Sequence, residues 1–470
     1  MTDLLRAEGV AFTYPQDGRG LRPVSLHLGE GQVLFIGGES GCGKSTLARC
    51  LSGMIPHLYR GQMNGAVWLA DQRTDQTPLW QLSELAGLVF QNPASQMLSP
   101  TVEEEIVFGL ENLGLPPAEI GRQVEETLAI FNLEELRSRS PQTLSGGEQQ
   151  KLALAAITAR HPNLLILDEP LSMLDTSAAF DLVNLLVKHT AQGGAVVICE
   201  HRQEYLRDFP NLHTIHLGST QRHLAIDTRF KWPATKYQEI RLDAENLIVE
   251  RGGRVILEGW SFHLQGGQVT AIVGRNGVGK TTLLRLLAGL QPYSGELAVY
   301  ADDQLERPQL GIVFQNPDLQ LFNPSVREEV LFHVARPDMD LYHCLLAALD
   351  LERYEQVPPL LLSEGEKRRV ALATVLMLCP RHGVLLDEPA LGLDTYHKLL
   401  LLRLLRALAG TGQVVVLSTH DIELAAQADR LVLLGPQGIV ASGAPQDLLL
   451  QPTLWEQVGL RIPDWVLPAC

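Results

Sequence analysis

The chain has no apolar run long enough to cross a bilayer, which takes roughly 18–20 apolar residues. Its richest apolar stretches, 370–378 and 399–408, are shorter, and Arg403 and Arg406 interrupt the second. Its first residues lack the basic start and the apolar core of a signal peptide. These absences predict a protein without a membrane span of its own that lies in the cytoplasm.

Clustered cysteine and an excess of basic charge are also lacking. The six cysteines are scattered over 470 residues without a C-x-x-C pair, which predicts a reducing compartment and no cysteine-built metal cluster. Asp and Glu outnumber Lys and Arg by 54 to 38, and the formal net charge is −16. This balance argues against a nucleic-acid-binding surface, although it leaves room for a local basic stripe.

Two glycine-rich loops with the pattern G-x-x-x-x-G-K-[ST] are the strongest signal present, and their lysines are 236 residues apart. In such a loop, backbone N–H groups and the N-terminus of the next helix surround phosphate, and the lysine reaches the β and γ oxygens. The predicted ATP-binding residues of the loops are Gly38, Glu39, Ser40, Gly41, Cys42, Gly43, Lys44, Ser45 and Thr46, and then Gly274, Arg275, Asn276, Gly277, Val278, Gly279, Lys280, Thr281 and Thr282.

Four further landmarks follow each loop in the same order. They are Phe-Gln-Asn-Pro (90–93 and 314–317), Leu-Ser-Gly-Gly-Glu (144–148) or Leu-Ser-Glu-Gly-Glu (362–366), Leu-Asp-Glu-Pro (167–170 and 386–389) and a histidine (201 and 420). A single loop pattern has false positives, but two ordered sets indicate a duplicated nucleotide-hydrolysing domain. We predict a first domain over residues 1–220, a linker over 221–243 and a second domain over 244–470.

Short, uniformly apolar runs bounded by turn residues alternate with longer helical patterns in both halves. They stand at 33–36, 164–167 and 195–198, and again at 269–273, 383–386 and 414–417. Such runs are typical of buried strands in a parallel sheet. Strands that alternate with helices predict an α/β fold with a largely parallel sheet in each half.

The landmarks place hydrolytic chemistry at the carboxyl ends of these strands. The aspartate of each Asp-Glu pair suits a Mg²⁺ contact and the glutamate suits a general base for the attacking water, while the glutamine amide and the histidine reach the metal, the water or the γ-phosphate. Taken singly, an Asp-Glu pair caps helices and a histidine is structural, but their recurrence favours the catalytic interpretation. The predicted catalytic residues are Gln91, Glu169, His201, Gln315, Glu388 and His420, and the predicted Mg²⁺ ligands are Ser45, Gln91, Asp168, Thr281, Gln315 and Asp387.

The order of these motifs resembles the ATP-binding-cassette ATPases over nearly the whole chain, twice. The resemblance implies two tandem P-loop cassettes, each a largely parallel sheet core with a helical subdomain, paired head to tail as an intramolecular pseudo-dimer. In that family the Leu-Ser-Gly-Gly signature of one cassette closes over the ATP that the other holds. By resemblance, Ser363 and Gly365 complete the site of Lys44, and Ser145, Gly146 and Gly147 complete the site of Lys280.

A finer resemblance is to the ATPases of energy-coupling-factor importers of vitamins or metal ions. It rests on Gln-Asn-Pro-Ala-Ser-Gln (91–96), Gln-Asn-Pro-Asp-Leu-Gln (315–320) and the acidic segment 101–109. It implies integral membrane partners, a coupling subunit and a substrate-binding subunit, and a peripheral place on the cytoplasmic face of the membrane. The alternative for 101–109 is a solvated helix capped by Thr101. The competing function is a soluble twin-cassette ATPase that acts on ribosomes or nucleic acid.

The two halves differ at two positions near the expected nucleotides. Tyr14 stands where cassettes stack an aromatic ring on adenine, and the second half has Arg251 there, for which stacking and a plain surface charge both remain open. Glu364 replaces the glycine found at 146. Because a carboxylate facing a triphosphate would be repelled, we expect this side chain to point away. Both sites should hydrolyse ATP, with the site of Lys44 the weaker.

Overall fold

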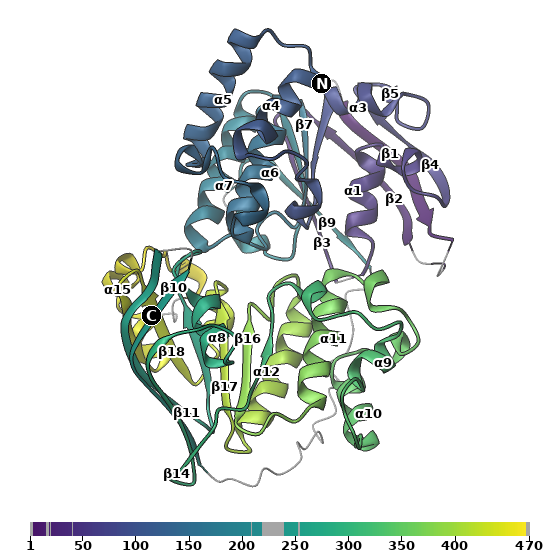
Figure 1. Ribbon diagram of the computed structural model, residues 1–470. Helices are drawn as coiled ribbons and strands as arrows, with labels where there is room; N and C mark the ends of the chain where they lie inside the picture. The colour runs from purple at the N-terminus through teal and green to yellow at the C-terminus, as the bar shows by residue number, and fades with distance from the viewer. Residues whose placement is uncertain are drawn as a thin grey trace. The chain divides into compact units, whose positions relative to one another are not determined.

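The computed structural model describes residues 3–15, 18, 20–39, 41–207, 209–218, 239–251 and 254–466. The chain divides into two compact units, Met1–Leu174 with Ala178–Arg222 and Asp175–Ser177 with His223–Cys470 (Figure 1). Most of the predicted linker, up to position 238, lies outside the described residues, and the first strand of the second unit begins at Ile240. Within the described ranges, none of the helices has the length and apolar character of a membrane span.

The first unit contains two sheets. Its parallel sheet has the order β6-β7-β8-β3-β9, and its antiparallel sheet has the order β2-β1-β4-β5. The parallel strands are β3 (Val33–Gly38), β6 (Ala86–Val89), β7 (Leu164–Asp168), β8 (Ala195–Cys199) and β9 (Leu212–Leu217). The antiparallel strands are β1 (Asp3–Thr13), β2 (Gly20–Gly29), β4 (Gln62–Leu69) and β5 (Gln72–Arg73). Every residue of β7 and β8 is buried, as the uniformly apolar runs predict.

Helices cover both faces of the parallel sheet in this unit. Apolar residues of α1 share a core with both sheets, and those of α4, α5, α6 and α7 form a second core on the other face. The helices are α1 (Lys44–Leu51), α2 (Met54–His57), α3 (Leu79–Leu85), α4 (Val102–Asn112), α5 (Pro117–Phe131), α6 (Gly146–Thr158) and α7 (Thr176–Ala191). Short 3₁₀ helices are η1 (Pro93–Gln96), η2 (Glu134–Leu136), η3 (Pro141–Thr143) and η4 (Gln203–Leu206).

The second unit repeats this plan. Its larger sheet has the order β15-β16-β17-β12-β18-β19 and is parallel except for the last pair, and its antiparallel sheet has the order β11-β10-β13-β14. The strands of the larger sheet are β12 (Val269–Val273), β15 (Leu310–Val313), β16 (Gly383–Asp387), β17 (Val414–Thr419), β18 (Arg430–Gly435) and β19 (Gly438–Gly443). The others are β10 (Ile240–Arg251), β11 (Arg254–Gln265), β13 (Ser294–Ala301) and β14 (Gln304–Glu306).

The helical part of the second unit is shorter between the glutamine motif and the signature. Here α9 has 5 residues and α10 has 10, where α4 and α5 have 11 and 15. The helices are α8 (Lys280–Leu287), α9 (Val326–Val330), α10 (Met339–Ala348), α11 (Glu364–Met377), α12 (Thr395–Ala409), α13 (Ile422–Ala425), α14 (Pro445–Leu449) and α15 (Pro452–Gln457), with η5 (Pro317–Leu319), η6 (Glu352–Tyr354), η7 (Pro359–Leu361) and η8 (Asp464–Val466). The predicted α/β fold with a largely parallel sheet in each half is confirmed.

Candidate nucleotide-hydrolysis sites

Each glycine-rich loop connects an inner strand of a parallel sheet, β3 or β12, to a helix. Gly43 and Gly279 precede α1 and α8 with φ angles of 104° and 110°, a left-handed conformation that favours glycine. The helix begins at the next residue, so its first N–H groups are not used within the helix and face the loop. This geometry suits phosphate binding. Ser40 of the first loop lies outside the described residues.

The loop lysines fold back over the loops that carry them. Lys44 Nζ donates to the carbonyl oxygens of Gly38 at 2.9 Å and Glu39 at 3.1 Å. Lys280 Nζ donates to Gly274 at 2.7 Å and Arg275 at 3.3 Å. Both side chains are buried, so each ammonium lies where phosphate oxygens would enter the loop.

The two Asp-Glu pairs stand at the ends of β7 and β16, beside the loops. Glu169 and Glu388 each have a φ of 50°, which is uncommon for a residue other than glycine. Their N–H groups donate to the neighbouring strand, to Cys199 at 2.8 Å and to Ser418 at 3.1 Å. Such strained residues cluster at functional sites. The same backbone conformation recurs in both copies, and each glutamate carboxylate lies near the histidine of its own copy.

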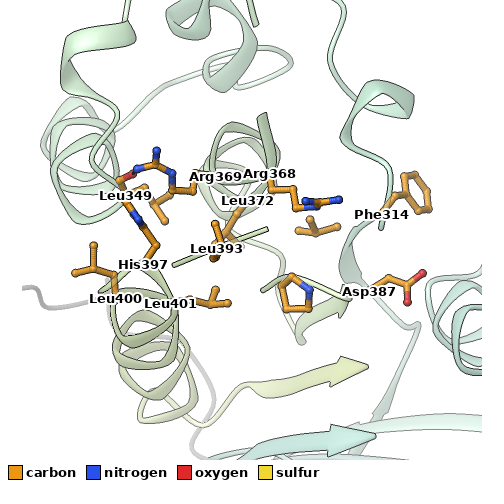
Figure 2. Close-up of a pocket in the computed structure, with 12 residues that line it drawn as sticks. Phe314, Leu349, Arg368, Arg369, Leu372, Asp387, Leu393, His397, Leu400 and Leu401 are labelled. Atoms are coloured by element: carbon orange, nitrogen blue, oxygen red, sulfur yellow. Dashed lines mark hydrogen bonds between the residues drawn. The ribbon is translucent and has the colours of Figure 1, made fainter. Parts of the chain in front are cut away.

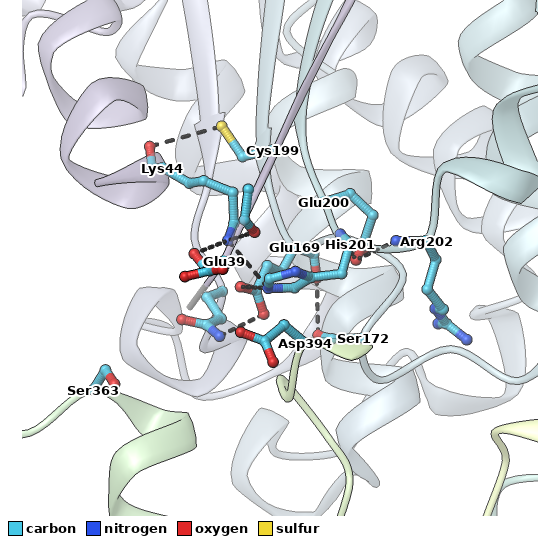
Figure 3. A network of polar contacts seen from close by, with 12 residues as sticks. Glu39, Lys44, Glu169, Ser172, Cys199, Glu200, His201, Arg202, Ser363 and Asp394 are labelled. Carbon is cyan, nitrogen blue, oxygen red and sulfur yellow. Dashed lines mark hydrogen bonds and ion pairs between the residues drawn. The ribbon is translucent and has the colours of Figure 1, made fainter. Parts of the chain in front are cut away.

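In the first unit the structure brings together the four side chains that the motifs single out. Gln91 Nε2 donates to Glu169 Oε2 at 2.6 Å, and His201 Nε2 lies 3.4 Å from Glu169 Oε1. Lys44 Nζ lies 3.1 Å from His201 Nε2. Figure 3 shows Lys44, Glu169 and His201 converging at this point. A base, a phosphate-binding cation and an amide therefore share one small volume.

The second unit forms the same group with different contacts. His420 Nδ1 lies 2.9 Å from Glu388 Oε2, and Lys280 Nζ lies 4.0 Å from Glu388 Oε1. Between Gln315 and Glu388, both of which the structure describes, there is no hydrogen bond like the one that Gln91 makes. The glutamine is therefore one member of the predicted group that the two copies hold differently.

Burial and neighbouring charges set the protonation of these carboxylates. Burial would raise the pKa of Glu169, but the hydrogen bond and charge of His201, with the charge of Lys44, outweigh it and lower the pKa. Burial would also raise the pKa of Glu388, but the charge and hydrogen bond of His420, with the charge of Lys280, outweigh burial and lower the pKa. An ionised glutamate can accept a proton from an attacking water. Both glutamates are therefore in the state that a general base requires.

The aspartates fit a Mg²⁺ contact. Burial and the adjacent Glu169 raise the pKa of Asp168 to about 7, and its Oδ1 atom is buried without a hydrogen-bond partner. A buried carboxylate oxygen of this kind requires a proton or a cation. Asp387 Oδ2 accepts a hydrogen bond from Thr281 at 2.7 Å. The residues that would hold Mg²⁺ are Ser45, Gln91 and Asp168 in one copy and Thr281, Gln315 and Asp387 in the other.

The rest of a Mg²⁺ coordination shell has to come from outside the protein. Across the described ranges, no group of three or more His, Cys, Asp and Glu side chains could hold a metal ion. Mg²⁺ prefers oxygen ligands, keeps several waters and binds with substrate phosphates more often than in an all-protein cage. The donor set of hydroxyl, carboxylate and amide oxygens therefore matches a metal that arrives with the nucleotide.

The signature segments begin α6 and α11 with matching caps. Ser145 and Ser363 each form a capping box, with Glu148 and Glu366 respectively. Gly146 and Gly147, and likewise Gly365, occupy the first turn, where helix N–H groups are unsatisfied. The two signature helices therefore share the same kind of cap, each within its own unit.

Glu364 has a partner on its own helix. Its Oε1 atom lies 3.4 Å from Lys367 Nζ, which also lies 2.8 Å from Asp318 Oδ1 in η5. The corresponding residues of the first unit are Gly146, Gln149 and Ala94, which carry no charge. The extra carboxylate of the second signature is thus part of an ion-pair cluster that the first unit lacks.

Tyr14 lies beside the first loop. Its hydroxyl is 3.4 Å from Thr46 Oγ1 and accepts a hydrogen bond from Arg49 at 3.1 Å. Its ring meets Phe12 edge to face, with the ring centroids 4.8 Å apart. The side chain of Arg251 lies outside the described residues. The adenine-stacking roles of both positions remain predictions.

Two segments of this chain, residues 21–172 and 257–391, match the family model of the ABC transporter. The chain belongs to this family. The predicted architecture of two tandem P-loop ABC domains is thereby confirmed. Membership also supports ATP binding, which in ABC ATPase domains generally involves Mg²⁺, and ATP hydrolysis.

Relatives of similar length carry transport names. A putative ABC transporter ATP-binding protein of Treponema denticola is 33% identical over 89% of this chain and 93% of its own length. The putative HMP/thiamine import ATP-binding protein YkoD of Bacillus subtilis is 32% identical over 99% of this chain and 96% of its own length. These names support a transport ATPase in general.

A ribosome-bound solved structure shares the fold. In a model of ribosome-bound archaeal Pelota and ABCE1, the matching chain has a TM-score of 0.69 and 20% identity, over 96% of this chain and 80% of that one. At this identity the likeness shows the fold alone.

The sequence did not point to the residues that directly precede the predicted catalytic histidines. Ser418 Oγ donates to Asp387 Oδ1 at 2.6 Å, and its counterpart in the first unit is Cys199. Glu200 accepts hydrogen bonds from the N–H groups of Leu171 at 3.1 Å and His201 at 2.7 Å. Alignment of the two halves at their histidines would have paired Cys199 with Ser418, but no motif marks either residue.

A small cavity of about 10 Å³ lies next to Asp387 in the second unit (Figure 2), room for about one water molecule. His397 from α12 and Arg369 from α11 line it. His397 Nδ1 lies 2.7 Å from Asp394 Oδ1, and His397 Nε2 lies 3.7 Å from Asp350 Oδ2. The first unit has Ala178 and Asn132 at the positions of His397 and Asp350. This buried polar link therefore belongs to one copy.

Stability should depend on pH through His397. Burial would lower its pKa, but Asp350 and Asp394 outweigh burial and raise it above the usual value. A group of this kind stabilises the fold fully below its unfolded-state pKa of about 6.5 and loses that contribution as pH rises through the folded-state pKa. We expect His397→Gln to lower the free energy of unfolding by roughly 1.5–3 kcal/mol at pH 6 and by less at pH 9, measured by urea denaturation.

The control for this prediction is His343→Gln in α10, at an exposed position. It should change stability little at either pH. An equal loss at pH 6 and pH 9 for His397→Gln would show that packing, and not charge, explains its contribution.

Proposed function

We propose that this chain is the ATP-hydrolysing subunit of an importer of the energy-coupling-factor type, for a vitamin or a metal ion. The observation that carries the proposal is a pair of exposed apolar side chains at equivalent positions of both copies, in the segments that follow the predicted catalytic glutamines. They are Leu98 and Phe108 in the first unit, exposed by 72% and 47%, and Phe322 and Phe332 in the second, exposed by 64% and 36%. Exposed apolar groups that recur in one place indicate a contact surface.

Buried polar side chains hold this surface in shape. Glu105 accepts the N–H groups of Leu98 at 2.9 Å and Ser99 at 2.8 Å. Glu329 accepts those of Phe322 at 2.8 Å and Asn323 at 2.7 Å. The backbone is thus fixed by a buried carboxylate while the apolar side chain is turned outward, and this arrangement is preserved in two sequences that differ.

Further hydrogen bonds tie the surface to the parallel sheets. Gln96 accepts the N–H of Phe90 at 2.8 Å and donates to Leu88 at 3.0 Å. Gln320 accepts the N–H of Phe314 at 2.9 Å and donates to Ile312 at 3.1 Å. A partner seated on the apolar side chains would therefore push on a segment that is fastened beside Gln91 or Gln315. An apolar segment of an integral membrane coupling subunit suits such a surface.

The proposed cycle uses residues of both copies. The two domains pair head to tail, so that Ser363 and Gly365 complete the site of Lys44, and the signature at 145–147 completes the site of Lys280. Nucleotide binding draws the domains together, and proton transfer to Glu169 or Glu388 during hydrolysis lets them part. The fused chain, with 221–243 proposed as its linker, makes this pairing intramolecular. The protein would act on the cytoplasmic face of the membrane.

The membrane partner can be tested with Leu98→Glu combined with Phe322→Glu. We expect the unaltered full chain to co-purify with a small integral membrane protein from its native host, and the double variant to lose it while keeping ATP hydrolysis. Leu58→Glu with Leu290→Glu is the matched control, because these side chains are exposed to a similar degree, by 60% and 56%, outside the proposed surface. Co-purification with ribosomes, and with no membrane protein, would support the soluble twin-cassette function and contradict the proposal.

A further inference from the structure

The residue opposite the predicted Mg²⁺-binding aspartate differs between the two copies. In the sheet register Asp168 pairs with Cys199, and Asp387 pairs with Ser418. Ser418 Oγ donates to Asp387 Oδ1 at 2.6 Å, while Thr281 Oγ1 donates to Asp387 Oδ2 at 2.7 Å. Both oxygens of this carboxylate are therefore held, and its plane is fixed.

The first copy holds its aspartate less firmly. Ser45 of the first loop lies near Asp168, but Asp168 Oδ1 is buried without a partner. The Cys199 thiol donates instead to the backbone oxygen of Lys44, with Sγ 3.7 Å from it (Figure 3). A thiol is a weak donor. Cys199 thus leaves open the position that Ser418 fills in the other copy.

We propose that Ser418 is a positioning residue that holds Asp387 for Mg²⁺, and that Cys199 withholds this support, so that Mg²⁺ strengthens nucleotide binding more at the site of Lys280 than at the site of Lys44. The inference rests on the ATP sites of the proposed function but not on the membrane partner. Groups that orient metal ligands from outside the coordination shell change metal affinity by about 10–100-fold. Ser418 is fully buried, so water cannot replace its hydroxyl.

The exchange of serine and cysteine provides a matched pair of variants. Ser418→Cys removes a strong donor and keeps nearly the same shape, and Cys199→Ser adds one beside the unpartnered oxygen. Each site is isolated in the full chain by Lys44→Ala or Lys280→Ala, in the background Glu169→Gln with Glu388→Gln to prevent turnover. The affinity for a fluorescent ATP analogue is then measured with Mg²⁺ and with EDTA, and the ratio gives the strengthening due to the metal.

We expect this ratio to be about ten-fold larger at the site of Lys280 than at the site of Lys44. Ser418→Cys should lower this ratio about ten-fold at the site of Lys280, and Cys199→Ser should raise it at the site of Lys44. Cys50→Ser, a buried thiol in α1, controls for a new buried hydroxyl and should change neither ratio. Equal ratios at the two sites of the unaltered chain, or no response to either exchange, would overturn the proposal.

Circular dichroism shows whether Ser418→Cys still folds. If it does not, Cys199→Ser tests the same proposal by adding a donor, and a failure to raise the Mg²⁺-dependent ratio overturns the proposal. The measurement does not involve transport. An unequal metal response in a chain that recovers ribosomes would uphold the positioning role and reject the importer, whereas equal responses in a chain that recovers a membrane subunit would do the reverse.

Discussion

Replacing Glu388 with Gln is expected to lower ATP turnover at the site of Lys280 by about 10²–10³-fold, and to lower the turnover of the whole chain by more than Glu169→Gln does. Glu388 is buried beside His420 and Lys280, and although burial would raise its pKa, these two neighbours outweigh burial and lower it. The site of Lys280 should contribute most of the turnover, because its aspartate is held on both oxygens. The site of Lys44 has an aspartate with one unpartnered oxygen and is completed, in the proposed pairing, by the signature that carries Glu364.

The rate of phosphate release at saturating ATP and Mg²⁺ tests this prediction. Glu126→Gln, on the exposed side of α5, is the control and should leave turnover unchanged, since its carboxylate lies in a surface ion pair with Arg122. Equal losses in Glu169→Gln and Glu388→Gln would show that the sites are equivalent. A loss confined to Glu169→Gln would reverse the proposed order.

Replacing Lys44 or Lys280 with Ala is expected to weaken ATP binding at the altered site by about 10²–10⁴-fold. Each ammonium lies at its loop, where two charge-assisted hydrogen bonds to phosphate would form, worth about 1.5–3 kcal/mol each when solvent competition is included. The loop carbonyls that now accept from each lysine would lose a donor as well. Binding of a fluorescent ATP analogue to the full chain should then show one strong site where the unaltered chain shows two.

The control for the lysine variants is Arg122→Ala, which removes a cation that is exposed by 67% on α5. Its binding curve should match that of the unaltered chain. Retention of two strong sites in either lysine variant would contradict the assignment of the loops to the phosphates.

The sequence predicts the parts of the sites that lie in motifs at strand ends. Asp168 and Glu169 end β7 beside the loop before α1, and the carboxyl ends of parallel strands meet at one edge, so the meeting of Lys44, Glu169 and His201 follows from the order of strands. The prediction for Thr101 shows where such reasoning stops. Thr101 does cap α4, but Glu105, four residues on, is buried and fixes the backbone of the exposed apolar side chains.

Contacts that depend on register or on another loop could not be predicted. The hydrogen bond from Ser418 to Asp387 exists because β16 and β17 pair at that residue, and a shift of one residue would turn the hydroxyl to the other face. Glu364 is visible in the sequence as an added charge, but its neighbours Lys367 and Asp318 come together only when η5 packs against α11. The copies share the order of their motifs, and they differ both inside a motif, at Glu364, and in residues around the motifs, such as Ser418.

The ion pair between Lys367 and Asp318 has a mechanical consequence. It clamps the segment after Gln315 to the helix that carries the second signature, whereas Ala94 and Gln149 leave the first copy without a charged clamp. If a membrane subunit pressed with equal force on both copies, the segment after Gln315 would move together with its signature helix. The segment after Gln91 would move more independently of its own signature helix. Equal forces from the membrane subunit would then displace the two signatures unequally. The amino-acid sequence would thereby set the order in which the two ATP sites open.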